Sequence, residues 1–244
     1  MKKIRLDKML ANSGLGSRKE VKSIIKSGAV LVSNEIVKDP GFLVGINEDN
    51  LQVNGKRLQY KEFHYLMMNK PPGVISATWD RDSKTVIDLL SEPYNKFDLF
   101  PVGRLDKDTE GLLLLTNDGQ LAHKLLSPKK QVPKTYYVEV PGKVVEHDII
   151  TFQRGIALEA DFTTLPSELD ILHSGDISKV LVTIYEGKFH QVKRMFEAVG
   201  KSVVYLKRIS MGNLKLDESL PLGEYKELTE EEMESIKNIF HKEH

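Results

Sequence analysis

The first 60 residues show two short helical patterns followed by strand-like alternation. Apolar residues recur at spacings of three and four in two sets, Leu6, Met9 and Leu10 and then Val21, Ile24 and Ile25. Ser17, followed three residues later by Glu20, predicts a capping box at the start of the second helix. Short apolar runs then lead into a turn at Ser33-Asn34 and into Asn54-Gly55, a pair typical of hairpins. We therefore expect a compact helix–helix–hairpin unit over residues 1–60.

The remainder of the chain, residues 61–240, alternates between strand-like and helical patterns. The strand candidates are Tyr65–Met68, Gly111–Leu115, Tyr136–Val140, Val180–Tyr185 and Val203–Ile209. The helix candidates are Thr85–Leu90, Gln120–Leu126, Glu146–Arg154 and Gln191–Val199. Thr229 and Glu232 have capping-box spacing and predict a closing helix. This order of elements predicts an α+β fold with a mixed, mostly antiparallel sheet.

Composition narrows the class of protein. Of the 244 residues, 40% are hydrophobic and 29% are charged, so the chain can bury a core. No apolar run approaches the roughly 20 residues that a membrane-spanning helix needs, and the N-terminus lacks the apolar centre of a signal sequence. The chain has no cysteine, which excludes disulfides, thiol catalysis and cysteine-ligated metals and fits a reducing cytoplasm. We expect a cytoplasmic protein without a membrane segment.

The net charge of zero hides an uneven distribution of charge. Residues 1–61 hold 12 Lys and Arg against 6 Asp and Glu, a net of +6, whereas residues 217–244 hold 3 against 9, a net of −6. Basic residues gather on and before the second predicted helix, at Arg5, Lys8, Arg18, Lys19, Lys22 and Lys26. A cationic helix face opposite an apolar stripe is typical of a surface that binds nucleic-acid phosphates, although ordinary soluble helices also carry lysines. Charge alone leaves both interpretations open.

Four segments carry residues suited to chemistry. They are Asn69-Lys70-Pro71-Pro72-Gly73, the stretch Gly103–Gly119, Lys134-Thr135-Tyr136-Tyr137-Val138, and the stretch Glu186–Phe196. In the second, a charge-dense loop that begins Gly103-Arg104-Leu105-Asp106 runs directly into an apolar strand. Catalytic residues concentrate on loops that a rigid strand holds in place. The fourth segment is a basic turn that enters a predicted helix, so both are candidates for an active site.

The order and content of these segments resemble the pseudouridine synthases, in the branch that modifies ribosomal RNA and carries a small N-terminal RNA-binding domain. The most specific motifs are Gly-Arg-Leu-Asp with Thr-x-Gly-Leu-Leu-Leu-Leu-Thr-Asn-Asp-Gly after it, and Glu-Gly-x-x-His-Gln-Val-Lys-Arg-Met. Residues 3–50 are similar to the alpha-L RNA-binding motif, which implies RNA contacts at Ser17 and at the basic residues named above. The resemblance implies an RNA-binding domain over residues 1–60, a catalytic domain over 61–240, no cofactor or metal, and a monomer.

Within that family, the chain is most similar to the member that acts on 16S rRNA. The similarity lies in Lys134-Thr135-Tyr136, the run from His190 to Phe196, and Gly223-Glu224-Tyr225. It implies that the partner is 16S rRNA or a small-subunit assembly intermediate, with the uridine at position 516 as the target. Two alternatives remain, namely a uridine of large-subunit (23S) rRNA as the target, or a non-catalytic RNA-binding assembly factor.

The resemblance assigns Asp106 as the catalytic residue. Pseudouridine formation breaks the N1–C1′ bond of a uridine, turns the uracil and joins its C5 to C1′. A carboxylate can attack C1′, as in a retaining glycosidase, or remove a ribose proton, and the sequence leaves both routes open. A nearby cation keeps the carboxylate charged in a closed site, and the resemblance gives this role to Lys193, with Arg194 as the alternative. His190 and Gln191 are expected to orient the turn before Lys193, and His190 is not expected to bind a metal.

Three further residues are expected to contact the substrate. By resemblance, Tyr136 stacks on the target uracil, whereas Tyr137 is expected to point the opposite way, with its ring in the core. Arg104 either fills the space that a flipped uridine leaves or binds a flanking phosphate, with a structural ion pair as the alternative. Lys70 is a candidate phosphate contact, although a surface lysine explains its position almost as well.

A hydrolase is the remaining rival to an isomerase. Glycoside hydrolysis needs a second positioned acid for the leaving group, and none is evident among the motif residues. Asp108 and Asp118 are interpreted as loop and turn residues, since Asp118-Gly119 is a tight-turn dipeptide. Asp106 inside its motif distinguishes an enzyme from an RNA-binding protein, because binding alone does not need that aspartate.

Overall fold

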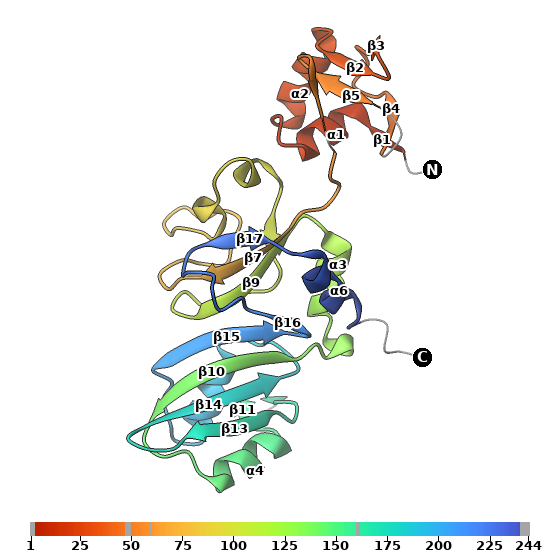
Figure 1. Cartoon of the computed structure of the whole chain (residues 1–244). Helices are drawn as coiled ribbons and strands as arrows, with labels where there is room; N and C mark the ends of the chain where they lie inside the picture. The colour runs from red at the N-terminus through yellow and green to blue at the C-terminus, as the bar shows by residue number, and fades with distance from the viewer. Residues whose placement is uncertain (1–2, 47–49, 59, 160–161, 240–244) are drawn as a thin grey trace. The chain divides into compact units, whose positions relative to one another are not determined.

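The computed structural model describes residues 3–46, 50–58, 60–159 and 162–239, and the chain divides into two compact units (Figure 1). The first unit runs to His64 and includes the segment Leu90–Leu99. The second unit contains Tyr65–Leu89 and the chain from Phe100 onward.

The first unit combines two helices with short antiparallel strands. Its elements are β1 (Lys3–Arg5), α1 (Leu6–Asn12), α2 (Arg18–Lys26), β2 (Val30–Val32), β3 (Glu35–Ile36), β4 (Leu43–Gly45), β5 (Leu51–Val53) and β6 (Lys56–Arg57). Strands β3-β2-β5-β6 form one antiparallel sheet, and β1 pairs with β4. The predicted capping box is confirmed, because Ser17 accepts a hydrogen bond from the backbone N–H of Glu20 and the Glu20 carboxylate accepts one from the Ser17 backbone. Val21 and Ile25 are fully buried on the inner face of α2.

The expected basic residues of the first unit differ in how they are held. Most of the residues that were expected to contact RNA are exposed, namely Lys8, Ser17, Arg18, Lys19, Lys22 and Lys26. Arg5 is also exposed, but its Nε and Nη2 donate hydrogen bonds of 3.1 and 2.9 Å to the buried carboxylate of Asp7. The Arg5 guanidinium lowers the pKa of Asp7 through these hydrogen bonds. Arg5 is therefore engaged within the fold, whereas the α2 cations face solvent.

The second unit is built on a nine-stranded sheet. Its strands are β7 (Tyr65–Lys70), β8 (Phe100–Pro101), β9 (Glu110–Thr116), β10 (Lys134–Pro141), β13 (Glu168–His173), β14 (Ile177–Ile184), β15 (Tyr205–Met211), β16 (Leu214–Lys215) and β17 (Tyr225–Glu227). The order is β13-β14-β10-β15-β9-β7-β17, with β16 beside β15 and β8 beside β9. All pairs are antiparallel except β15 with β9. The sheet is mixed and mostly antiparallel, as predicted.

The parallel pair divides the sheet into two halves. We call β17, β7, β9 and β8 the first half-sheet, and β13, β14, β10, β15 and β16 the second half-sheet. Only Lys207 with Glu110 and Arg208 with Gly111 are paired between them. Gly111 has a φ of 101°, and a Cβ there would lie 2.2 Å from the backbone oxygen of Arg208. Glycine is therefore required where the two half-sheets meet.

Helices cover the two half-sheets separately. The helices of this unit are α3 (Gly119–Leu126), α4 (Glu146–Arg154), α5 (Gln191–Ala198) and α6 (Glu230–Lys237), and a separate small hairpin consists of β11 (Ala157–Glu159) and β12 (Phe162–Thr163). Residues of α3 and α6 share one apolar cluster with β7 and β9, and Figure 1 shows these two helices side by side. On the second half-sheet, α4 packs beside β13, and its Phe152 meets Phe196 of α5 with ring centroids 5.0 Å apart.

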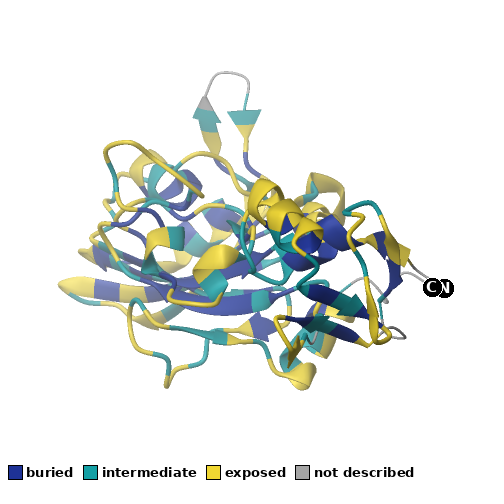
Figure 2. Ribbon diagram, turned by 90° about the horizontal axis from the view of Figure 1, so that it is seen from above, coloured by how far each residue is buried: buried dark blue, intermediate teal, exposed yellow. Residues whose placement is uncertain are grey.

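Burial along the strands reflects this covering. The strands β7 and β9 are buried almost continuously, whereas β10 alternates between buried and half-buried residues. Figure 2 shows that buried residues gather in the strands of the sheet, and that exposed residues lie mostly on helices and loops. Continuous burial indicates cover on both faces, and alternation indicates cover on one face. On β10, Lys134, Tyr136, Val138 and Val140 share the buried face. Among the described residues, no helix is long and apolar enough to cross a membrane.

Several sequence predictions were wrong in detail. Thr85–Leu90 forms only a 3₁₀ turn over Ile87–Leu89, because Asp88 accepts hydrogen bonds from the backbone N–H and hydroxyl of Thr85 and closes one tight turn. Asp118 is the N-cap of α3 and accepts hydrogen bonds from two backbone N–H groups of its first turn. Tyr137 is not a core residue, since it lies half-exposed with its hydroxyl donating to Glu139. The Thr229–Glu232 capping box is confirmed at the start of α6.

Candidate active site

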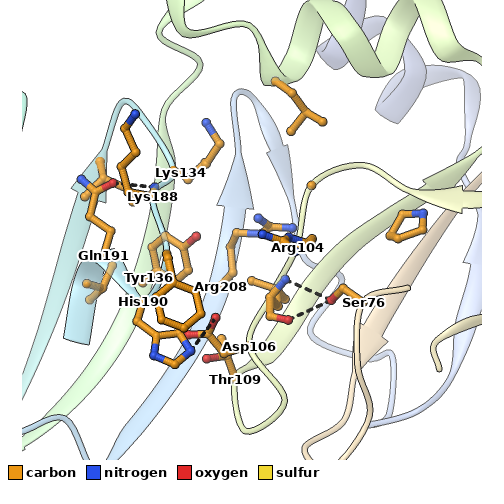
Figure 3. Close-up of a pocket in the computed structure, with 18 of the residues that line it drawn as sticks. Ser76, Arg104, Asp106, Thr109, Lys134, Tyr136, Lys188, His190, Gln191 and Arg208 are labelled. Carbon is orange, nitrogen blue, oxygen red and sulfur yellow. Dashed lines mark hydrogen bonds and ion pairs between the residues drawn. The ribbon is translucent and has the colours of Figure 1, made fainter. Parts of the chain in front are cut away.

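A cavity of about 980 Å³ opens in the second unit beside the sheet. The loop before β9 supplies one wall, including Arg104 and Asp106, and the turn between β14 and α5 supplies the opposite wall, including His190 (Figure 3). Tyr136 of β10 and Arg208 of β15 line it from the second half-sheet. The cavity therefore draws residues from both half-sheets, and it brings together three of the four segments that the sequence singled out.

The loop that carries Asp106 is held in place by hydrogen bonds from the side chains of Ser76 and Lys70. Ser76 donates to the backbone oxygen of Leu105 at 2.9 Å and accepts from its N–H at 3.0 Å. The ammonium group of Lys70 donates to the backbone oxygens of Thr109 at 2.9 Å, Pro71 at 3.0 Å and, more weakly, Lys107 at 3.4 Å. These bonds hold both ends of the loop against the first half-sheet, so Asp106 has a defined position.

Lys70 differs from both expectations for it, since it is neither a surface lysine nor part of the cavity wall. The side chain is fully buried, and its ammonium is occupied by backbone oxygens. Burial lowers the pKa of Lys70 to about 8, although the charges of Asp106, Asp108 and Glu110 act in the opposite direction. Its role in this structure is to position the loop, and the expected phosphate contact does not fit this location.

Asp106 lies between two cationic or potentially cationic groups. Nε2 of His190 is 3.6 Å from its Oδ1, and Nζ of Lys193 is 3.9 Å from its Oδ2. Both separations exceed a direct hydrogen bond, so the interaction with Asp106 is electrostatic. Lys193 makes its short contacts with Asp108, at 2.7 Å to each carboxylate oxygen, and these bonds lower the pKa of Asp108. Lys193 thus bridges the two aspartates.

The alternative cation, Arg194, points elsewhere. Its guanidinium approaches the backbone oxygens of Phe189 and Leu158 at 3.5 Å. Lys193 is therefore the member of the pair that faces Asp106, as the sequence interpretation placed it. Among the described residues no group of three His, Asp or Glu side chains could hold a metal ion.

The turn before α5 is organised by His190 and Gln191. His190 adopts a left-handed backbone conformation with φ of 49° at the N-cap of α5, and its ring stacks on Phe189 at 3.8 Å. A non-glycine residue in this conformation is strained and is common at functional sites. The amide of Gln191 accepts from the backbone of Lys188 at 2.9 Å and donates to Glu186 at 3.1 Å. These contacts present the His190 imidazole to Asp106.

Tyr136 and Arg104 lie on different sides of the cavity. Tyr136 is buried, and its neighbours on β14 and β15 are Val182 and Arg208. Arg104 is exposed and lines the cavity, and among the described residues it forms no ion pair, so the structural alternative for it finds no support. An exposed guanidinium on one side of a cavity and a buried aromatic ring on the other suit a polyanion whose base enters the cavity.

Sequence reasoning missed two buried cations that line the same cavity. Lys134 was noted only as part of a motif, and Arg208 was placed in a strand without a role. Both are nine-tenths buried or more, and both line the cavity beside Tyr136. One signal in the sequence could have identified these two residues. Lys134 and Arg208 are charged, although they lie in strand-like segments whose other buried positions are mostly apolar.

Two segments of the chain match known protein families. Residues 64–198 match the family of RNA pseudouridylate synthases, and residues 4–50 match the S4 domain. The chain belongs to the RNA pseudouridylate synthase family. A crystal structure of a pseudouridylate synthase superposes with a TM-score of 0.67 at 39% identity, over 96% of this chain and 99% of that one.

Three curated members of the family match almost the whole chain. An uncharacterized RNA pseudouridine synthase of Bacillus subtilis is 53% identical over 94% of this chain and 97% of its own length. A ribosomal small subunit pseudouridine synthase A of Vibrio cholerae is 41% identical over 96% and 99%. A ribosomal large subunit pseudouridine synthase B of Bacillus subtilis is 38% identical over 96% and 96%. The S4 match supports an RNA-binding role for the first unit of this pseudouridine synthase.

Proposed function

We propose that this pseudouridine synthase isomerises a uridine of small-subunit (16S) rRNA, with Asp106 as the catalytic residue. The observation that carries the proposal is the position of Asp106 in the cavity, opposite Tyr136 and within 4 Å of Lys193 and His190. The similarity to small subunit pseudouridine synthase A supports the choice of RNA, and position 516 is the most specific form of the proposal. The substrate is 16S rRNA or a small-subunit assembly intermediate, and the enzyme acts as a monomer in the cytoplasm.

The roles of the other residues follow from their places around Asp106. Tyr136 stacks on the uracil after the uridine leaves the RNA stack, which stabilises the flipped base by roughly 1–3 kcal/mol. Arg104 binds the backbone beside the flipped nucleotide. Lys193 and His190 stabilise the Asp106 carboxylate, and Gln191 holds the turn that carries His190. The exposed cations of the first unit bind phosphates farther along the RNA, and residues 1–60 supply this RNA-binding domain.

A hydrolase is disfavoured by the second aspartate of the loop. Asp108 is the acid nearest to Asp106 in sequence, but its hydrogen bonds from Lys193 lower its pKa and keep it charged. A charged carboxylate cannot protonate a leaving group. The loop therefore supplies one carboxylate for chemistry and a second that holds Lys193, which suits an isomerisation without a general acid for a departing alcohol.

Mapping pseudouridine in RNA treated with the enzyme tests the proposal directly. Wild-type protein and Asp106→Asn are incubated with separate preparations of partly assembled small subunits, free 16S rRNA and 23S rRNA. Wild type is expected to modify one uridine in small-subunit RNA, and Asp106→Asn to leave it unmodified while binding the RNA with similar affinity. Modification of 23S rRNA alone would establish the large-subunit alternative, which the similarity to a large subunit pseudouridine synthase B keeps open. Full activity in Asp106→Asn would contradict the assignment of the catalytic residue.

A further inference from the structure

Two buried cations stand beside Tyr136 on neighbouring strands. Lys134 lies two residues before Tyr136 on the same buried face of β10, and Arg208 of β15 is the register partner of Tyr136. Both line the cavity, with exposures of only 8% for Lys134 and 2% for Arg208 (Figure 3). Together they place two positive charges around the ring on which the uracil is proposed to stack.

The hydrogen bonds of these cations are incomplete. Nε of Arg208 donates to the backbone oxygen of Leu112 at 2.8 Å, but Nη2 of Arg208 is buried and has no hydrogen-bond partner among the residues that the structure describes. Nζ of Lys134 donates to the backbone oxygen of Val132 at 2.7 Å and has two further protons to donate. Among the described residues, no carboxylate forms an ion pair with either. Buried polar groups nearly always have partners, so a missing acceptor indicates a place for a ligand oxygen.

The electrostatic cost of this arrangement supports the same conclusion. Burial, together with the smaller effect of the neighbouring charge of Arg208, lowers the pKa of Lys134 to about 8. Two like charges buried together without an anion destabilise the folded protein. An incoming group that carries or develops negative charge would relieve that cost, so the cavity is arranged for such a group at this position.

The reaction itself moves a negative charge through the cavity. When the N1–C1′ bond breaks, its electron pair stays on the uracil and is shared with the O2 and O4 oxygens. At the same time Asp106 becomes neutral, whether its oxygen bonds to C1′ or takes up a ribose proton. One unit of negative charge therefore passes from Asp106, which Lys193 and His190 stabilise, to the uracil. A second set of cations is needed at the uracil to stabilise the transition state that leads to this anion.

We propose that Lys134 and Arg208 donate hydrogen bonds to the carbonyl oxygens of the flipped uracil and stabilise the uracil anion after glycosidic cleavage. This inference rests on the proposed function, because it places the uracil against Tyr136. A backbone phosphate is the competing ligand. Burial argues against it, since the exposed Arg104 already offers a guanidinium where the RNA backbone can reach.

The test compares two leaving groups. Arg208→Met and Lys134→Met replace each cation with an apolar chain of similar length, and Lys207→Met removes a half-exposed lysine adjacent to Arg208 as a matched control. Single-turnover rates of N1–C1′ bond cleavage are measured at saturating concentration of whichever rRNA the wild type modifies, carrying uridine or 5-fluorouridine at the target. Cleavage is the step compared, because the fluorinated base has no C5 proton to lose and cannot complete the isomerisation. Fluorine stabilises the departing anion, so it makes the reaction less dependent on cations of the enzyme.

The expected result is a loss that depends on the leaving group. Arg208→Met should slow the reaction of uridine by about 100-fold, as expected for loss of a preorganised donor, and that of 5-fluorouridine by about tenfold less. Lys134→Met should show the same trend, whereas Lys207→Met should change neither rate. RNA affinity should stay at the wild-type value for all three variants, because the cations act on the transition state.

Three outcomes would overturn the inference. Equal losses with uridine and 5-fluorouridine, accompanied by a lower melting temperature, would assign Lys134 and Arg208 a structural role. Weaker RNA binding with a shallower salt dependence, at an unchanged rate, would assign them to a phosphate. Wild-type rates in both variants would remove them from the reaction. Modification of 23S rRNA alone would instead contradict the small-subunit proposal, and the comparison of variants would still be made on that RNA.

Discussion

The protein holds positive charge in two contrasting ways. On α2 of the first unit, Lys19, Lys22 and their neighbours extend into solvent over an apolar inner face. In the second unit, Lys70, Lys134 and Arg208 are buried beside the cavity or beneath its loop. Exposed cations of this kind are suited to attract phosphates at long range and are screened by salt, whereas buried cations are suited to short, direct hydrogen bonds. We therefore propose that similar residue types serve binding in one unit and chemistry in the other.

This contrast means that changes to the two groups should have separable effects. Removal of a buried cation should change the rate or the stability of the fold with little effect on affinity. Removal of an exposed cation should change affinity and its salt dependence with little effect on the rate. The predictions below test that separation, beginning with the largest expected effect.

Replacing Lys70 with methionine is expected to produce the largest effect. The change removes the hydrogen bonds that hold the Asp106 loop, and a catalytic group misplaced by about 1 Å can cost about 100-fold in rate. Single-turnover rates at saturating RNA should fall by about this factor, with RNA affinity unchanged. The matched control is Lys107→Met, an exposed lysine of the same loop. A loss of affinity rather than rate would assign Lys70 to the substrate after all.

Titration of Lys70 should change the reaction rate and the stability of the fold in opposite directions. The pKa of Lys70 is about 8 in the folded chain and near 10.5 in the unfolded chain, so between these values the unfolded chain binds the additional proton. The contribution of Lys70 to the free energy of unfolding therefore rises from pH 8 to 10.5, because the buried charge is lost. The rate should fall over the same interval, since a neutral amine donates fewer hydrogen bonds to the loop.

Urea unfolding and single-turnover rates, each measured from pH 7 to 10, check this prediction. Lys134 also has a lowered pKa, so the comparison is made between wild type and Lys70→Met. The variant should lose part of the rise in stability above pH 8. An identical pH profile of stability in the two proteins would show that Lys70 does not titrate in this range.

The exposed group is tested by replacing Lys19 and Lys22 together with glutamine. Loss of two phosphate contacts should reduce the slope of log affinity against log salt by about 1.4 to 1.8 and weaken binding several-fold at physiological salt. The rate at saturating RNA should not change. Filter binding across a salt series measures both quantities, with the double replacement of the exposed Lys143 and Lys179 of the second unit by glutamine as a control for net charge. An unchanged slope would exclude these two residues from the RNA interface.

Arg5 is exposed like the cations of α2, but it is hydrogen-bonded within the fold. Its replacement should therefore have the smallest effect on RNA binding. Its guanidinium is committed to Asp7, so Arg5→Gln should lower the melting temperature by a few degrees and change RNA affinity by less than about twofold. Because the pKa of Asp7 is lowered in the folded chain, this stabilisation is present above the unfolded value near 4 and is lost as the pH falls through the folded value. The difference in melting temperature between wild type and variant should therefore shrink below pH 4.

The sequence predicted the exposed features of the molecule better than the buried ones. The capping boxes at Ser17 and Thr229 depend on residues three positions apart, and the pattern alone located both. The same local reasoning failed at Thr85, where a similar polar pair closes only a single 3₁₀ turn. Local spacing identifies a helix start but does not show whether enough apolar contacts follow to extend it.

The candidate site shows the same division. Asp106, Lys193 and His190 lie in motifs that could be identified from the chain and come together in the structure. The approach of Arg208 to Tyr136 depends on the pairing of β15 with β10, which no local pattern specifies. Lys70 was interpreted as a phosphate contact, with a surface lysine as the alternative, and only the three-dimensional contacts show that it supports the loop. Contacts between distant segments are what the sequence could not supply.

The junction at Gly111 affects the geometry of the whole cavity. Asp106 belongs to a loop carried by the first half-sheet, whereas Tyr136 and Arg208 belong to the second. The two half-sheets meet in a close backbone approach at Gly111, where even a methyl group would collide with Arg208. The junction therefore connects the loop of Asp106 to the strands that carry Tyr136 and Arg208. A substitution elsewhere in either half-sheet can be accommodated by small local shifts. A displacement at Gly111 instead changes the distance between Asp106 and the residues of the second half-sheet.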